Sequence, residues 1–203
     1  MRSSLQAVFG ISEPIIDVEF AGRTDPWIVR RILRKFGLPE TQENFDRYLD
    51  GYISALPEHM RAAGARVLPG VEFLLDAAAS RPGVAQGLLT GNIRKGAQTK
   101  LAFHGLWHHF PFGAFADDSE IRNELGPHAL RRAREHCGLV FDLERVWVIG
   151  DTPHDIACAR AVGVRVLAVA TGGSTASDLS AHRPDALMES MEDGEAFWRI
   201  IHG

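Results

Sequence analysis

The sequence predicts an α/β protein, with a Rossmann-like parallel sheet as its core and a small all-helical cap before it. Three observations lead to this fold class. Residues 1–66 show helical patterns only, strands alternate with helices from Arg66 onward, and several strands are near-continuous apolar runs. Such strands are typical of a parallel sheet covered by helices on both faces. We therefore expect a cap over residues 1–66, with any residual linker to the core, and an α/β core over residues 67–203.

Two amphipathic helices are predicted in the cap. The first lies in "TDPWIVRRILRKFG", where Thr24 or Asp25 can serve as N-cap, Pro26 suits the first turn and Gly37 ends the helix. The second covers roughly residues 41–63, with apolar residues at helical spacing. Because no strand separates them, these helices are expected to pack together as one small unit.

The core is predicted from strands and helices in alternation. The expected strands cover residues 84–90, 113–116, 145–150, 164–171 and 184–188. The expected helices between them include residues 93–104, 127–137 and 154–163. In a parallel sheet, ligands bind at the carboxyl ends of the strands, where successive loops converge. The chemistry is therefore expected in the loops that follow these strands.

The composition is that of an ordinary globular protein, with 24% charged residues and a net charge of −4. That balance gives no general attraction to nucleic acid or to an anionic membrane, and the basic residues 131–134 suit a solvated helix face. No apolar run approaches the roughly 20 residues that span a bilayer, and "MRSSLQAVFG" is too short and mixed for a secretory signal. We expect a cytoplasmic protein with Cys137 and Cys158 as free thiols; the oligomeric state stays open.

Two loops that follow predicted strands carry polar residues suited to phosphate chemistry. Thr90, Gly91 and Asn92 follow the first strand, where a hydroxyl and exposed backbone N–H groups can hold a phosphate oxygen. Asp151 and Asp155 follow the third strand, and two hard oxygen donors there suit Mg²⁺. Each loop alone could also be an ordinary helix cap. Their joint placement at one edge of a parallel sheet favours a site.

The segments "LLTGN" and "GDTPHDIACARAVG", with the two-helix insert before them, resemble the haloacid dehalogenase-like hydrolases, in the phosphoglycolate-phosphatase-like branch with a helical cap. The resemblance implies that Thr90 binds the phosphoryl group, with Gly91 and Asn92 beside it. It also implies that Asp151 is the magnesium ligand and that Asp155 supports the metal or its water shell. The implied reaction is Mg²⁺-dependent hydrolysis of a small phosphomonoester through an aspartyl-phosphate.

Two cationic residues are candidates for further roles. The family's third motif is usually a lysine, but no lysine follows Lys100 before Asp151, and Arg122 in "SEIRNEL" is the candidate replacement. A guanidinium can bridge a carboxylate and a phosphate, although an ordinary surface arginine is the alternative. The segment around Arg23 is expected near the hinge between cap and core, where Arg23 or Thr24 faces the anionic leaving group of the substrate. Helix capping by Thr24 or Asp25 is the alternative explanation of that segment.

The family's first motif, an apolar strand ending in Asp-x-Asp-Gly-Thr, does not occur in the sequence. The nearest segment, "PIIDVEF" with Asp17 and Glu19, is rejected because Pro14 shortens the apolar run and Gly-Thr does not follow. The chain is therefore expected to begin just after the first core strand and its nucleophile, through truncation or real loss. The neighbours of that strand would then expose apolar surface and unpaired backbone groups, which favours self-association.

Three alternatives to the phosphatase hypothesis are open. A dehalogenase would act on a carbon–halogen bond without magnesium, and a phosphoglucomutase-like enzyme would share the metal chemistry. A non-catalytic or truncated binding protein is favoured by the absent first motif, whereas the intact "GDTPHD" segment argues for catalysis. The identity of the phosphate ester cannot be predicted, because fold resemblance does not establish the substrate.

Overall fold

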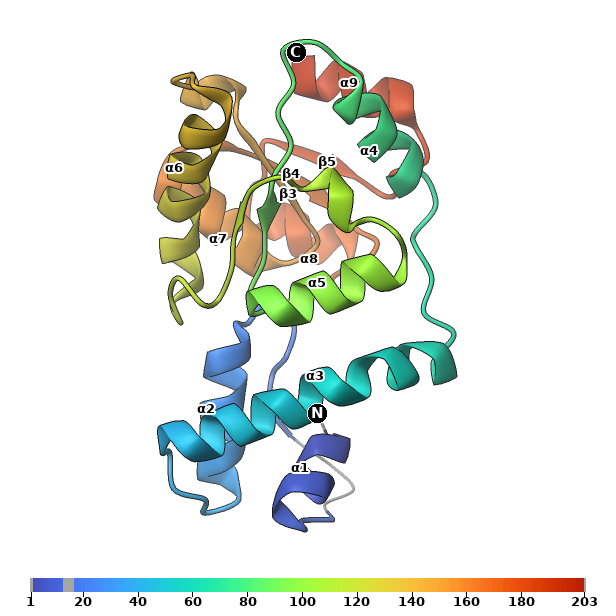
Figure 1. The fold of residues 1–203 in the computed structure, drawn as a ribbon. Helices are drawn as coiled ribbons and strands as arrows, with labels where there is room; N and C mark the ends of the chain where they lie inside the picture. Colours follow the sequence, from blue (N-terminus) through green and yellow to red (C-terminus); the bar gives the residue numbers. More distant parts are fainter. Residues whose placement is uncertain (1, 13–16, 203) are drawn as a thin grey trace.

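The computed structural model describes residues 2–12 and 17–202. Its first three helices are α1 (Arg2–Phe9), α2 (Asp25–Lys35) and α3 (Gln42–Ala62). They lie together at one end of the molecule, below the sheet and its covering helices in Figure 1. The helices α2 and α3 were predicted, whereas α1 was not.

The three N-terminal helices share one apolar cluster. Its buried members are Leu5, Ile28, Val29, Ile32, Leu33, Tyr48, Leu49, Tyr52, Ile53 and Leu56. The predicted N-cap of α2 is confirmed at Thr24, whose hydroxyl accepts from the Trp27 N–H at 3.4 Å. Because α1 contributes the fully buried Leu5, its short helix is stabilised by packing rather than by its own sequence.

The rest of the chain alternates strands and helices, as predicted. In order, the elements are α4 (Val71–Ala79), β1 (Leu88–Leu89), α5 (Arg94–Phe103), β2 (Gly113–Ala114), α6 (Leu125–Cys137), β3 (Trp147–Gly150), α7 (Pro153–Val162), β4 (Arg165–Val169), α8 (Ala176–Ala181), β5 (Ala186–Met188) and α9 (Gly194–His202). Short 3-10 turns at Trp107–His109, Arg122–Glu124 and Leu143–Arg145 complete the list. Each observed strand falls inside a predicted one, but β1 and β2 are shorter than expected.

The strands are parallel, as the apolar runs predicted, and they form two short sheets within the described residues. The strand β1 pairs with β2, and β3 pairs with β4, which pairs with β5. Residues of β4 such as Val166 and Leu167 are fully buried, whereas Ile149 on β3 is 45% exposed. Within the described residues β3 pairs only with β4, so its other edge is open. Of the rejected first-motif segment, Pro14 lies outside the described residues, and Asp17 and Glu19 are exposed and outside any strand.

The open edge of β3 is expected to make the protein associate as its concentration rises, because unpaired strand edges with apolar side chains pair with other chains. The substitution Ile149→Lys should lower that association, measured by sedimentation velocity over a range of protein concentrations. Val140→Lys is the matched control, since Val140 is 84% exposed but lies in a loop away from any strand. A wild-type protein that stays monomeric at every concentration would contradict this expectation.

Two further sequence expectations can be compared with the structure. No helix of the described part is long and apolar enough to cross a membrane. Both cysteines are free thiols, with Cys158 buried and Cys137 half-buried.

Candidate functional site

The loops after β1 and β3 meet through one arginine. Arg122 forms an ion pair with Asp155, and the guanidinium is largely buried. On the other side, a Cβ placed on Gly91 would lie 2.8 Å from Nη1 of Arg122, so the guanidinium lies against the backbone of the first loop. The backbone of Arg122 is also bonded to α7, because Cys158 Sγ donates to the Arg122 carbonyl at 3.4 Å. The structure thus brings Gly91 and Asp155 to opposite sides of Arg122, and all three are predicted site residues.

Asp155 has two structural partners at once. One carboxyl oxygen accepts from the Thr152 backbone N–H at 3.0 Å and from the Thr152 hydroxyl at 2.7 Å, which completes a capping box at the start of α7. The other oxygen accepts from Arg122. With only 6% of the residue exposed, Asp155 has little free lone-pair capacity. Its geometry suits a residue that orients Arg122 and nearby water more than a direct metal ligand.

Asp151 lies at the tip of β3 and faces the loop after β4. A Cβ on Gly172 would overlap the Asp151 carboxylate, so the absence of a side chain there makes room for the acid. Burial raises the pKa of Asp151, and the negative charge of nearby Asp155 adds to the effect. A carboxylate in this position gains from a bound cation, which offsets both the desolvation and the repulsion.

The donor set of the site suits magnesium. In the part of the chain that the structure describes, no group of three or more His, Cys, Asp or Glu side chains could hold a metal. Asp151 supplies one carboxylate as a hard oxygen donor, and the carboxylate of Asp155 beside it is largely engaged by Arg122 and Thr152. Mg²⁺ usually binds one or two carboxylates and takes its other ligands from water and substrate phosphate, whereas zinc requires a fuller protein ligand set. The residues present therefore fit Mg²⁺.

The loop after β1 presents a hydroxyl and backbone groups. The Thr90 hydroxyl oxygen accepts from the Asn92 backbone N–H at 3.2 Å, and its hydrogen donates to no described residue. The Asn92 side chain is already used, because its amide donates to Asp25 at 3.1 Å and its oxygen accepts from Lys100 at 3.0 Å. Thr90 is thus available to a ligand, while the Asn92 side chain stabilises the loop.

The sequence predicts Asp25 only as a possible N-cap of a helix. In the structure it also joins the N-terminal helices to the loop after β1, residues 90–92, which we call the phosphate-side loop. Its carboxylate accepts from the Ile93 N–H at 2.9 Å and from Asn92, and its own N–H donates to the Gly91 carbonyl at 2.7 Å. Only 1% of the residue is exposed, and burial raises its pKa. No sequence signal distinguishes this long-range role, because an acid beside Thr24 is explained fully by capping.

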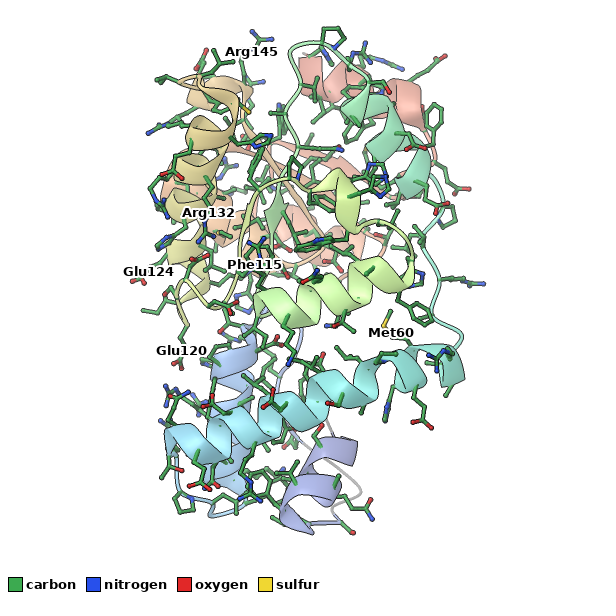
Figure 2. All side chains as sticks on the ribbon, in the orientation of Figure 1. Met60, Phe115, Glu120, Glu124, Arg132 and Arg145 are labelled. Atoms are coloured by element: carbon green, nitrogen blue, oxygen red, sulfur yellow. The ribbon has the colours of Figure 1, made fainter. Side chains whose placement is uncertain are left out.

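Thr24 extends the junction to a second loop. Its hydroxyl donates to the Glu120 carbonyl at 2.7 Å, and Arg30 forms an ion pair with the Glu120 side chain at 2.8 Å. Figure 2 shows Glu120 at the edge of the core where it meets α2. The start of α2 is therefore bonded to the loop after β1 and to the segment that leads into Arg122.

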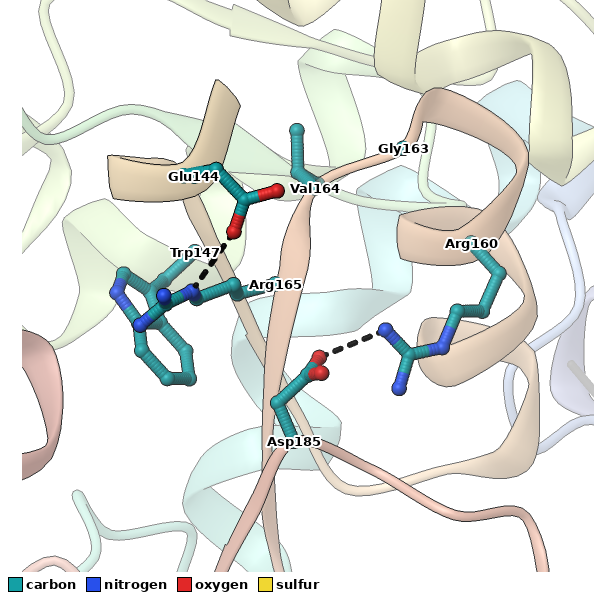
Figure 3. A pocket seen from close by; sticks show the side chains of 7 residues that line it. All are labelled: Glu144, Trp147, Arg160, Gly163, Val164, Arg165 and Asp185. Carbon is teal, nitrogen blue, oxygen red and sulfur yellow. Dashed lines mark hydrogen bonds and ion pairs between the residues drawn. The ribbon is translucent and has the colours of Figure 1, made fainter. Parts of the chain in front are cut away.

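A pocket of about 640 Å³ opens beside this junction. It is lined by Gly22, Arg23, Thr24, Trp27, Ser119, Glu120, Ile121, Arg122, Asn123 and His154. Arg23 and Arg122, both predicted as site residues, therefore line one pocket. A separate pocket of about 490 Å³, shown in Figure 3, lies at the amino ends of β3 and β4, where Arg160 pairs with Asp185 and Arg165 with Glu144. The second pocket is at the opposite end of the strands from the loops described above.

Comparison with known proteins agrees with this arrangement. Residues 122–194 match the family model described as HAD-hydrolase-like. The chain is also 32% identical over 177 residues to the plasmid-encoded phosphoglycolate phosphatase of Cupriavidus necator, an alignment that covers 85% of this chain and 72% of the relative. The chain belongs to the haloacid dehalogenase-like hydrolases. By this relationship the chain resembles phosphoric monoester hydrolases.

A further relative and two solved structures are also similar to this chain. A phosphoglycolate phosphatase of Rhodospirillum rubrum is 28% identical over 150 residues, covering 72% of this chain and 61% of the relative. A hydrolase from Pseudomonas syringae has a TM-score of 0.72 at 19% identity, covering 98% of this chain and 88% of that one. A predicted phosphoglycolate phosphatase from Haemophilus somnus has a TM-score of 0.68 at 17% identity, covering 97% and 88%. The two structures confirm the fold class.

Proposed function

We propose that this haloacid dehalogenase-like protein serves the Mg²⁺-dependent hydrolysis of a small, phosphoglycolate-like phosphomonoester through an aspartyl-phosphate. The observation that carries the proposal is Arg122, which lies against the Gly91 backbone and pairs with Asp155. The guanidinium of Arg122 thus lies between the loop after β1 and the acidic loop after β3. A cation in this place is suited to stabilise the negative charge of a phosphoryl group during its transfer. In this proposal residues 1–66 are the cap and residues 67–203 the core.

Each side chain has a separate task in the proposed reaction. The Thr90 hydroxyl and the backbone N–H of Gly91 donate to phosphoryl oxygens, and Arg122 neutralises their charge in place of the usual lysine. Asp151 would hold Mg²⁺, with Asp155 supporting the surrounding water and fixing Arg122. Bound Mg²⁺ would supply further positive charge to the phosphoryl oxygens. The attacking carboxylate is expected from a first motif of the Asp-x-Asp-Gly-Thr type, which is not in the 203 residues.

A non-catalytic binding role is the second candidate function, because the capping box and the ion pair of Asp155 are structural contacts that need no turnover. Such a protein would bind Mg²⁺ and a phosphate ester at the same residues without turnover. The two candidates therefore differ in phosphate release and agree in binding.

The test measures both properties on the same preparations. Calorimetry with Mg²⁺ and phosphoglycolate is expected to show binding that EDTA abolishes, and Asp151→Asn should weaken Mg²⁺ affinity about 100-fold, because a ligand carboxylate is lost. Asp178→Asn is the matched control, since Asp178 belongs to an exposed capping box on α8 and does not line the pocket beside Arg122. Mg²⁺-dependent phosphate release would support the phosphatase, and binding without release would support the second candidate. Mg²⁺ affinity that is equal in Asp151→Asn and the wild type would contradict both.

A further inference from the structure

We propose that Arg23 and His154 form a subsite for a carboxylate on the substrate, and that Glu19 occupies this subsite until substrate displaces it. The inference rests on the proposed function and names its substrate class: phosphate esters whose leaving group carries a carboxylate. It also assigns a specific place to Glu19, an exposed acid outside the pocket lining.

The carboxylate of Glu19 bridges donors from two distant parts of the chain. Arg23 donates to Oε2 of Glu19 through Nε at 2.9 Å and through Nη2 at 2.6 Å. His154 Nε2, at the start of α7, lies 3.5 Å from the other oxygen, Oε1. The hydrogen bond from Arg23 lowers the pKa of Glu19, with a further contribution from His154, so the acid is held as the carboxylate. The arrangement is that of a bound carboxylate ligand, supplied here by the protein.

The two donors are held in place independently of Glu19. The Arg23 guanidinium lies over the Trp27 ring, 4.5 Å from the ring centroid. Gly22 keeps its backbone close to His154, because a Cβ at this position would lie only 2.6 Å from the imidazole Cδ2. Gly22 also has a φ of +68°, which favours glycine. Removal of the Glu19 carboxylate is therefore expected to leave the two donors near each other.

The proposed carboxylate subsite opens into the same pocket as Arg122. Arg23, His154 and Arg122 all line the pocket of about 640 Å³, and Arg122 lies against Gly91 of the phosphate-side loop. The acid in that lining, Glu120, is already paired with Arg30. A ligand with a phosphate at Arg122 and a carboxylate at Arg23 would thus find unlike charge at both ends.

A substrate carboxylate can displace Glu19 from Arg23 and His154, because Glu19 is not a fixed part of the pocket wall. Its side chain is 53% exposed, and ion pairs of such exposed groups are weak because water competes for both partners. A substrate carboxylate held at its other end by the phosphoryl site would compete with Glu19 at high effective concentration. We therefore expect the protein to bind phosphate esters with a carboxylate more tightly than esters without one. Competition from the Glu19 carboxylate makes this difference in affinity smaller.

The test compares two ligands that differ in this one group. Binding of phosphoglycolate and of ethyl phosphate to the full chain is measured by calorimetry with Mg²⁺ present. Arg23→Gln should weaken phosphoglycolate binding about tenfold, because one charge-assisted contact is lost, and leave ethyl phosphate unchanged. Glu19→Gln should tighten phosphoglycolate binding severalfold, again without effect on ethyl phosphate. Glu40→Gln is the matched control, because Glu40 forms a similar exposed pair with Arg34 outside the pocket.

The outcomes separate this inference from the proposed function. If both esters bind equally in the wild type and neither variant changes their ratio, the carboxylate subsite is wrong while the phosphoryl site stands. If Glu19→Gln weakens phosphoglycolate binding, Glu19 is a structural part of the wall and the displacement is wrong. If neither ester binds, the proposed function fails and the subsite fails with it.

Discussion

Replacing Arg122 by alanine is expected to lower phosphate-ester affinity, and any turnover, by about 100-fold or more, the usual effect of losing a donor to developing negative charge. The same change leaves the carboxylate of Asp155 buried without its ion pair, with 6% of the residue exposed. Breaking a buried pair from one side costs about 3 to 5 kcal/mol in the free energy of unfolding. We expect the lower end, because Thr152 still donates two hydrogen bonds to Asp155.

Arg132→Ala separates the two effects of the Arg122 change. Arg132 pairs with the part-buried Asp118 through two contacts of 2.6 Å, on α6 and outside the pocket that Arg122 lines (Figure 2). Urea denaturation should show lower stability in both variants, whereas calorimetry should show lost ligand affinity only for Arg122→Ala. The variant Arg122→Lys should recover part of the affinity, since it keeps the charge but not the fork. An Arg122→Ala variant that binds the phosphate ester as tightly as the wild type would contradict a role of Arg122 in ligand binding.

Replacing Asp25 by alanine is expected to lower the free energy of unfolding by about 3 kcal/mol, because the Ile93 N–H and the Asn92 amide each lose a buried acceptor. It should also loosen the loop that holds Thr90, seen as faster hydrogen exchange at the Ile93 amide. Asp178→Ala removes an exposed capping-box acid and should lower the free energy of unfolding much less, with no effect on exchange at the Ile93 amide. Unchanged exchange at Ile93 in Asp25→Ala would contradict the proposed coupling.

The pH dependence of stability gives a second measurement on Asp25. Burial raises its folded pKa above 3.8, the ordinary value for an aspartate, so the folded state binds the proton more tightly than the unfolded state. Its contribution to stability is therefore present below that value and is lost as pH rises through the higher, folded pKa. Asp25→Asn has no such titration. The stability of the wild type relative to Asp25→Asn should thus fall as the pH is raised from about 3.8 towards neutrality, measured by urea denaturation.

The features that depend on local pattern could be predicted from the sequence. The strand β4 (Arg165–Val169) lies inside a near-continuous apolar run, and Thr24 caps α2 as its place before Asp-Pro indicates. The loops at the strand ends follow from the same reasoning, because parallel strands bring their carboxyl ends together.

The features that depend on long-range packing could not be predicted. The helix α1 is short, and its Leu5 is buried only because α3 lies beside it, which no local pattern encodes. Asp25 reaches residues 67 and 68 positions away in the chain, while its local sequence is explained by capping alone. Only the resemblance, in which a lysine precedes the acidic loop, indicates Arg122 as a site residue, because its contact with Gly91 depends on the fold.

The double use of Asp155 affects how its presence in a chain should be interpreted. Selection for a correctly started α7 retains this acid whether or not the protein turns over a substrate, as the similar box at Thr175 and Asp178 on α8 illustrates. The intact "GDTPHD" segment is therefore weaker support for catalysis than it first suggests. Asp151 takes no part in that box. During evolution, a chain relieved of catalysis would be free to lose Asp151 first, so Asp151 is the better marker of a working site.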